Sequence, residues 1–124
     1  MFGVLLIAHG NKRSKATTIM QAIAKGVSDQ LPNALVAYWF IWQSNGDLES
    51  VFNQFASPDM QEIVIIPYFL FDGVHVTKTV REIAAAMAVF YPQKTIAISN
   101  PLGIDPRLAE IVADRIREQR RGHT

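Results

Sequence analysis

Short apolar runs alternate with longer amphipathic stretches along this 124-residue chain. Four runs predict strands, because they are too short for helices and are rich in apolar, β-branched or aromatic residues. They extend over Phe2 to Ala8, Leu35 to Trp42, Ile63 to Ile66 and Thr95 to Ser99. The stretches that follow each strand carry apolar residues three and four positions apart, which is typical of helices.

Capping signals mark where the predicted helices begin. The first helix is expected over Lys15 to Leu31, and Asp47 is a plausible N-cap for a short second one. Thr79-Val80-Arg81-Glu82 has the pattern of a capping box, which predicts that the third helix begins just after His75. Asp105-Pro106 provides an N-cap and a first-turn proline for the last helix.

The strict alternation of strands and helices predicts an α/β fold. Short connections favour a doubly wound, four-stranded parallel sheet with strand order 2-1-3-4 and helices on both faces. No linker, internal repeat or low-complexity segment interrupts the pattern, so we expect residues 1–124 to form one domain.

Composition removes several classes of function. The longest apolar run, Ala34 to Trp42, is far shorter than the ~20 residues of a membrane span. The first residues lack a charged leader and a cleavage site, so we expect a cytoplasmic protein. A net charge of +1 gives no case for nucleic-acid binding. The chain has no cysteine, so any metal would need imidazole, carboxylate or substrate donors.

Two of the three histidines fall where the predicted fold would bind a ligand, at the carboxyl ends of the strands. His9 directly follows the first strand, His75 follows the third, and His123 lies in the tail. Each one alone could be an ordinary hydrogen-bonded residue. However, the first and third strands would be neighbours, and two neutral imidazoles can hold Co²⁺, Ni²⁺ or Fe²⁺.

Three segments, two of which contain these histidines, resemble a known family. They are Leu5 to Gly10, Pro67 to Val76 and Pro101 to Pro106. Together they resemble the small sirohydrochlorin cobaltochelatases of cobalamin biosynthesis. The resemblance implies a chelatase (lyase) that inserts a divalent ion, Co²⁺ first among them, into a sirohydrochlorin-type tetrapyrrole. It also implies that His9 and His75 bind the metal, that the metal is a substrate with no prosthetic group present, and that the protein is a homodimer.

Sirohydrochlorin has many carboxylates, so the walls of such a site should carry cations or N–H donors. The candidates for this role are Lys12, Arg13, Lys15, Lys78, Arg81 and the backbone amides of Leu102 and Gly103. Each of the cations could equally be an ordinary surface residue.

Trp42 is a departure from the family pattern, because members commonly have a glutamate at this position. The tetrapyrrole could stack on Trp42, or metal affinity could be weaker, or activity could be lost. Asp72, where the loop often has proline, could supply the missing charge.

Two other functions remain open at this point. One is a non-catalytic metal or tetrapyrrole carrier with the chelatase fold. The other is a histidine phosphatase, since Leu6 to Gly10 resembles the first strand of those enzymes. That class requires an arginine before its histidine, whereas this chain has Ala8 there.

Overall fold

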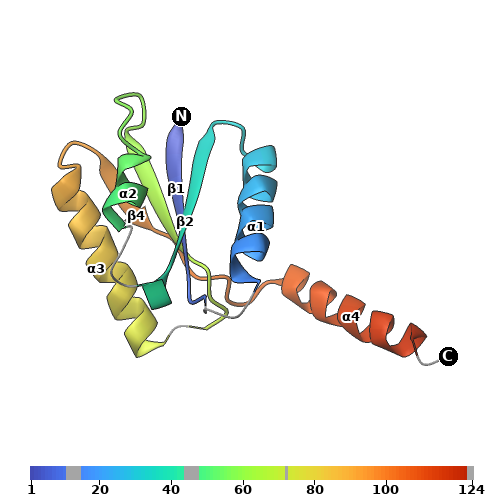
Figure 1. Cartoon of the computed structure of the whole chain (residues 1–124). Helices are drawn as coiled ribbons and strands as arrows, with labels where there is room; N and C mark the ends of the chain where they lie inside the picture. The colour runs from blue at the N-terminus through green and yellow to red at the C-terminus, as the bar shows by residue number, and fades with distance from the viewer. Residues whose placement is uncertain (11–14, 44–47, 72, 123–124) are drawn as a thin grey trace.

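A computed structural model describes residues 1–10, 15–43, 48–71 and 73–122 of the chain (Figure 1). The elements are, in order, β1 (Phe2–Ala8), α1 (Ala16–Gln30), β2 (Ala34–Phe40), the short 3₁₀ helix η1 (Ile41–Gln43), α2 (Leu48–Asn53), β3 (Glu62–Pro67), α3 (Val74–Phe90), β4 (Thr95–Ile98) and α4 (Pro106–Arg121). All four predicted strands and all four predicted helices are present.

The strands form one parallel sheet with the order β2-β1-β3-β4, as predicted. Val4 pairs with Val36 of β2 and with Val64 of β3, which in turn pairs with Ala97 of β4. Because side chains alternate between faces along a strand, this register places the four residues on the same face of the sheet.

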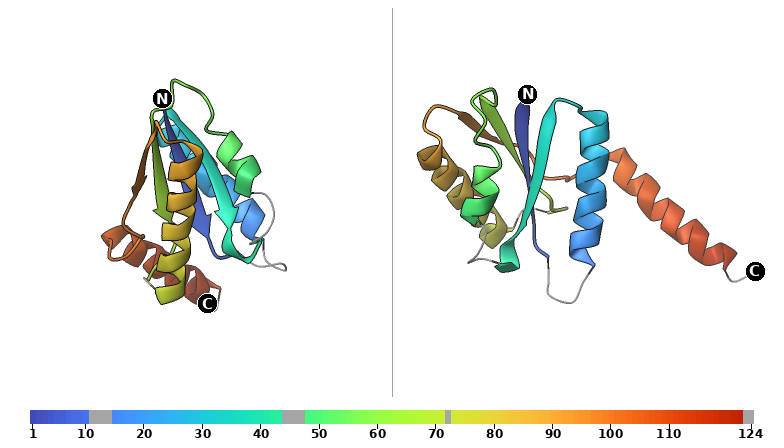
Figure 2. Two further views of the ribbon diagram at one scale, coloured as in Figure 1. Left: turned by 90° about the vertical axis from the view of Figure 1, so that its left-hand side faces the viewer. Right: turned by 45° about the horizontal axis from the view of Figure 1, so that its top comes forward.

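Helices cover both faces, which confirms the doubly wound arrangement (Figures 1 and 2). On one face α1 packs over β1 and β2, with Met20 buried against Val4 and Leu6. On the other face α2 and α3 bury a larger core. No helix of the described residues is long and apolar enough to cross a membrane.

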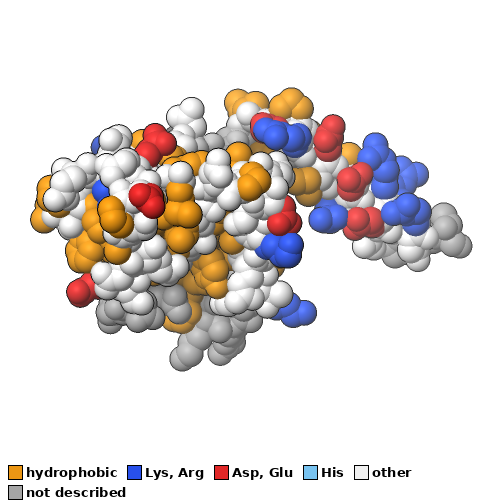
Figure 3. All heavy atoms as spheres, turned by 90° about the horizontal axis from the view of Figure 1, so that it is seen from above, with side chains coloured by type: hydrophobic (Ala, Val, Ile, Leu, Met, Phe, Trp, Pro, Cys, Tyr) orange, Lys and Arg blue, Asp and Glu red, His pale blue; other side chains and the backbone are white. Residues whose placement is uncertain are grey.

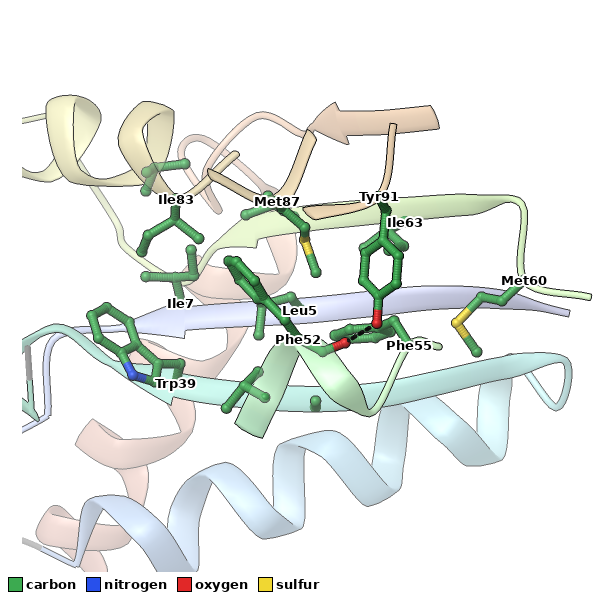
Figure 4. Packing of buried hydrophobic residues seen from close by; sticks show 14 residues of the cluster. Leu5, Ile7, Trp39, Phe52, Phe55, Met60, Ile63, Ile83, Met87 and Tyr91 are labelled. Carbon is green, nitrogen blue, oxygen red and sulfur yellow. Dashed lines mark hydrogen bonds between the residues drawn. The ribbon is translucent and has the colours of Figure 1, made fainter. Parts of the chain in front are cut away.

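The larger core is nearly all hydrocarbon and sulfur (Figure 4). Its most deeply buried side chains come from β1, β3, α3 and the segment between α2 and β3, and they are Leu5, Ile7, Phe55, Met60, Ile63, Ile65 and Met87. Tyr91, at the end of α3, donates a hydrogen bond from its hydroxyl group to the backbone carbonyl of Phe52 in α2. This bond joins the two helices that cover the face.

Two predicted boundaries were wrong. The third helix begins at Val74, so His75 lies in its first turn rather than before it. Gly73, in an extended conformation, is the N-cap, and Thr79 donates its hydroxyl to the carbonyl of His75 instead of capping a helix. The second strand ends at Phe40, and Trp42 lies in η1.

The position of the last helix differs most from expectation. Its boundary is as predicted, with Asp105 as N-cap and Pro106 in the first turn. Yet α4 covers neither face of the sheet. It begins beyond the carboxyl ends of the strands and projects away from the rest of the molecule (Figures 1 and 2), and none of its residues is buried.

Candidate functional site

The carboxyl ends of the strands carry the loops that the sequence marked as candidates, and backbone hydrogen bonds tie these loops together. The N–H of Tyr68 donates to the carbonyl of Ile7 at 2.8 Å, which joins the ends of β3 and β1. The N–H of Trp42 donates to the carbonyl of His9 at 3.3 Å. Thus the ends of β2, β1 and β3 form one connected edge, which we call the carboxyl edge.

His9 lies at this edge as the first exposed residue after β1, directly behind the buried Ala8. His9 lines a cavity of about 500 Å³ together with Tyr68 and Phe69. Gly10 turns the chain with φ of 67°, and a Cβ there would lie 2.6 Å from the ring of Phe40. Glycine is therefore needed at this position, and the conformation of the residue that follows His9 is fixed.

His75 is exposed in the first turn of α3. Because β3 pairs with β1, the segment that leads to His75 starts beside the strand that ends at His9. The structure therefore places both histidines in segments that leave adjacent strands at the carboxyl edge, as the sequence predicted. Ala8, between Ile7 and His9, is buried and apolar, so this position offers no cation for a phosphate.

A complete metal site is not present within the described residues. Among them, no three His, Asp or Glu side chains gather closely enough to hold an ion. Asp72, considered above as a source of charge, lies outside the described residues.

Trp42 lies close to His9. Its indole Cδ1 would be 2.8 Å from a Cβ at Gly10, and 42% of its surface is exposed. An exposed, flat aromatic ring beside the histidine is a surface on which a planar ligand can stack.

The segment from the end of β3 into the first turn of α3 exposes apolar side chains for which no role was predicted. Phe71 is 82% exposed and Val74 is 85% exposed, and Leu70 is also exposed. These exposed apolar side chains are close to His75 in the sequence, and an apolar ligand could cover them. The signal was present in the sequence as an apolar run between a strand and a helix.

A second cavity, of about 340 Å³, opens between this loop and the end of β4. Its walls combine apolar residues with polar ones, and they include Pro67, Phe69, Phe71, Val76, Thr77, Val80, Arg81, Ile98, Ser99, Asn100 and Pro101. Arg81 brings a positive charge to it, and Asn100 brings an amide. Arg81 was among the predicted substrate-binding cations, whereas Asn100 was not predicted to have a role.

The other predicted substrate contacts differ in their availability. Lys12 and Arg13 lie outside the described residues. Lys78 is exposed in α3, with its Nζ 3.9 Å from a carboxylate oxygen of Glu82. Leu102 already donates its N–H to the carbonyl of Phe69 at 3.0 Å, which leaves Gly103 as the amide of that pair to receive a carboxylate.

Comparison with known proteins identifies the family. The profile of the CbiX family matches residues 3–119. The chain belongs to the CbiX family. A relative from Methanosarcina acetivorans, a sirohydrochlorin cobaltochelatase, is 27% identical over 123 residues, covering 94% of this chain and 95% of the relative.

Two solved structures share the CbiX fold seen here. The CbiX protein of Marinobacter aquaeolei superposes with a TM-score of 0.73 at 23% identity, covering 96% of this chain and 97% of the other. The sirohydrochlorin chelatase SirB of Bacillus subtilis, solved in complex with cobalt, gives a TM-score of 0.71 at 23% identity, covering 95% of this chain but 51% of SirB.

Proposed function

We propose that this chain is a sirohydrochlorin chelatase that inserts Co²⁺ into the tetrapyrrole. The observation that carries the proposal is the pair of exposed histidines, His9 and His75, on segments that leave adjacent strands of a CbiX-family fold. Relatives of nearly the same length, such as the one from Methanosarcina acetivorans, are sirohydrochlorin cobaltochelatases. The alternative substrate metals are Ni²⁺ and Fe²⁺, because imidazole binds all three ions.

His9 and His75 would receive the ion as neutral imidazoles. Water, the incoming pyrrole nitrogens and the second subunit would complete its coordination. Insertion is an exchange in which one dication enters the ring as two pyrrole N–H protons leave. A histidine that releases the ion can accept one of these protons, so no covalent intermediate is needed.

The exposed apolar side chains at the carboxyl edge would hold the flat ring. Leu70, Phe71 and Val74 lie on the His75 side, and Trp42 lies on the His9 side. Contact with the ring would remove these side chains from water, which is favourable in proportion to the apolar area that is covered. The same contact would shield the reacting nitrogens from solvent.

The carboxylates of the substrate would be bound at the rim of this apolar surface. Arg81 and Asn100 line the 340 Å³ cavity and provide a guanidinium group and an amide there. A guanidinium can bind a carboxylate through two parallel N–H donors. Lys12, Arg13, Lys78 and Gly103 remain further candidates for the other carboxylates.

A homodimer is part of this proposal. The chain spans about half of SirB, but nearly the whole of its cobaltochelatase relative. Two copies would therefore supply as much chain as one SirB molecule. A planar ring also has two faces, and two subunits related by a twofold axis can enclose it from both sides.

The proposal is tested by measuring the absorbance of the metallated ring after the protein is mixed with sirohydrochlorin and Co²⁺. His9→Ala and His75→Ala should each abolish insertion above the uncatalysed rate. His123→Ala, which removes the third histidine of the sequence, is the matched control and should retain activity. Circular dichroism would show that all three variants are folded. Full activity in both His9→Ala and His75→Ala would disprove the assignment.

A non-catalytic carrier is the second candidate, and Trp42 is the observation that favours it. This residue places an indole ring beside His9, where the resemblance described above implies a glutamate. A carrier would bind Co²⁺ or the tetrapyrrole without raising the insertion rate. The same absorbance assay, combined with calorimetric binding of each ligand, separates the two functions.

A further inference from the structure

A cavity of about 290 Å³ lies between α3 and the end of β2, behind the carboxyl edge. Trp39 of β2, Ile41 of η1 and Leu48 of α2 line one side of it. The residues of α3 that line the other side are Thr79, Glu82, Ile83 and Ala86. The proposed function gives none of these residues a role, so this cavity is separate from the surfaces that would hold the tetrapyrrole.

Trp39 contributes a buried hydrogen-bond donor to the wall of this cavity. The residue is only 5% exposed, and its indole N–H has no acceptor within the ranges that the structure describes. Trp39 pairs with Ile7, one residue before both strands end, and Figure 4 shows it at the end of the core nearest the carboxyl edge. Buried N–H groups are nearly always hydrogen-bonded, because burial removes their bond to water. An acceptor that enters the cavity would therefore be favoured.

Glu82 contributes a negative charge at the outer side of the cavity. Its side chain is 63% exposed, and its carboxylate lies 3.9 Å from Nζ of Lys78. An exposed ion pair at this distance is weak, so the carboxylate can bind another cation. Thr79, on the same helix, donates its hydroxyl hydrogen to the carbonyl of His75 at 2.9 Å. Its oxygen is thus left to act as an acceptor.

The remaining wall of the cavity is apolar, because Leu48, Ile83 and Ala86 present only hydrocarbon side chains. A ligand that matches all of these groups has three parts. It has an oxygen that accepts a hydrogen bond from Trp39, a positive charge for Glu82, and a hydrocarbon chain that joins the two. The chemistry of the wall therefore excludes anions and fully polar molecules as good ligands.

We propose that this cavity binds a small alkylammonium compound that also carries a carbonyl or hydroxyl oxygen. The oxygen accepts the hydrogen bond from the indole of Trp39, and the ammonium group binds the carboxylate of Glu82. The methylene chain between them lies against the apolar wall. The volume of the cavity is at the lower end of the range of about 300 to 1,000 Å³ that is usual for ligand sites, which favours a small molecule over a protein segment.

A ligand in this cavity would contact both elements that lead to the carboxyl edge. Ile41 directly precedes Trp42 in η1, and Thr79 is hydrogen-bonded to the carbonyl of His75 in α3. The inference does not depend on the proposed chemistry, because binding can be measured without Co²⁺ or sirohydrochlorin. Failure of this site would leave the chelatase proposal intact.

The test uses N-acetylputrescine, which has an acetamide carbonyl at one end, an ammonium group at the other and a short methylene chain between them. The protein has two tryptophans and therefore two indole N–H signals in an NMR spectrum, which Trp42→Phe assigns. We expect the probe to shift the Trp39 signal saturably, with a dissociation constant of about 1 mM or lower. A shift of the Trp42 signal alone would place the probe elsewhere and overturn the proposal.

Two related compounds test the chemistry of the ligand. N-Pentylacetamide has a methyl group in place of the ammonium group, and heptylamine has methylene groups in place of the amide. Each should bind at least about tenfold more weakly than N-acetylputrescine, because each lacks one polar interaction. Equal affinities of the three compounds would show that the cavity binds any alkyl chain, which contradicts the proposed recognition.

Glu82→Gln tests the cation contact in the protein. It removes the charge of an exposed side chain and should weaken binding of N-acetylputrescine at least about tenfold. Glu118→Gln is the matched control, because Glu118 is also an exposed helical residue that pairs with a cation, Arg115. It lies on α4, along which Figure 3 shows acidic and basic side chains gathered. Equal losses in the two variants would mean that Glu82 does not contact the probe.

A pair of neighbouring alanines tests the position of the site. Ala86 lines the cavity and Ala85 does not, although both are exposed on α3. Leucine is a strong helix former, so both Ala86→Leu and Ala85→Leu should fold. Ala86→Leu should fill the cavity and abolish binding of N-acetylputrescine, and Ala85→Leu should bind it as the wild type does. Binding that survives in Ala86→Leu would overturn the proposed position.

Two other states of the cavity would also overturn the proposal. If water alone fills it, N-acetylputrescine causes no saturable shift of the Trp39 signal. If Glu82 turns inward and itself accepts the hydrogen bond from Trp39, the probe again does not bind. In that case Glu82→Gln moves the Trp39 signal in the absence of any ligand, which distinguishes this state from the first.

Discussion

The indole ring of Trp42 packs against Gly10, the residue that follows His9. The backbone of Trp42 also donates a hydrogen bond to the carbonyl of His9. The loop that carries the first candidate ligand is therefore held by the end of a neighbouring strand. Gly10 and Trp42 can each be substituted separately, and the first two predictions concern these substitutions.

Gly10→Ala should destabilise the protein and slow metal insertion. The left-handed backbone and the contacts with Phe40 and Trp42 leave no room for a methyl group, and the strain alone costs about 1 to 3 kcal/mol. Urea unfolding measures this loss. Gly26→Ala is the control, because Gly26 lies inside α1 with open space around it and alanine should stabilise that helix by about 1 kcal/mol. Unchanged stability of Gly10→Ala would contradict the geometry.

Trp42→Glu should strengthen binding of Co²⁺, because it places a carboxylate beside His9. Trp42→Gln has a similar shape without the charge and is the matched control. Calorimetric titration should show a dissociation constant at least about tenfold lower for the glutamate variant than for the glutamine variant. Equal constants would mean that position 42 does not face the ion.

Local sequence signals predicted most of the fold. The strands were found because their apolar runs are short, and the first and third of them are followed by His9-Gly10 and by Pro67. The start of α4 was found because Asp105-Pro106 is a strong cap. The start of α3 was missed, because its N-cap is Gly73, which has no side chain to signal the role. Thr79, which seemed to mark the start, bonds backward within the helix.

The site was predicted only in part, because some of it depends on how separate elements pack together. Chain order and sheet topology bring the segments of His9 and His75 to one edge, so both were within reach of sequence reasoning. The cavity that Arg81 and Asn100 share depends on how α3 meets the end of β4. The course of α4 was also beyond prediction, because an amphipathic pattern shows that a helix has an apolar face but not which surface covers it.

Arg81→Gln should weaken binding of sirohydrochlorin with little effect on the maximal rate. A guanidinium that binds a substrate carboxylate contributes equally before and during insertion, so its loss should raise KM about tenfold. Lys25→Gln, on α1 and paired with Asp29, removes a surface charge elsewhere and is the control. Steady-state kinetics of metal insertion measure KM and the maximal rate for both variants. If both variants show the same KM, Arg81 does not contact the substrate.

Tyr91→Phe should destabilise the core in a way that depends on pH. Loss of the hydrogen bond to Phe52 costs about 1 to 2 kcal/mol near neutral pH. Burial raises the pKa of Tyr91 above its ordinary value of 10.0. Since the folded pKa is the higher one, the contribution of the tyrosine is full below pH 10.0 and falls as the pH rises through the folded pKa.

Urea unfolding of both proteins between neutral pH and about pH 11 checks this prediction. The difference in unfolding free energy between wild type and Tyr91→Phe should shrink at the alkaline end. A difference that stays constant over this range would show that the hydroxyl group is equally solvated in the folded and unfolded chains.

The last prediction concerns Asp105, the N-cap of α4. The guanidinium and the backbone N–H of Arg107 both bind its carboxylate and hold its pKa well below the ordinary 3.8. A lowered folded pKa means that the cap is fully present above pH 3.8 and is lost only as the pH falls through the folded value. Protection in the first turn of α4 should therefore persist in wild-type protein somewhat below pH 3.8.

Asp105→Ala should remove that protection at every pH, since alanine cannot accept the N–H of Arg107. Amide hydrogen exchange at Arg107 and Leu108, followed by NMR, measures the effect directly. Asp114→Ala is the control, because it removes an aspartate from the middle of α4 whose carboxylate pairs with the side chain of Arg117. Faster exchange in the Asp105 variant alone would establish the cap. Equal exchange in the two variants would show that Pro106 and the helix itself hold the first turn without Asp105.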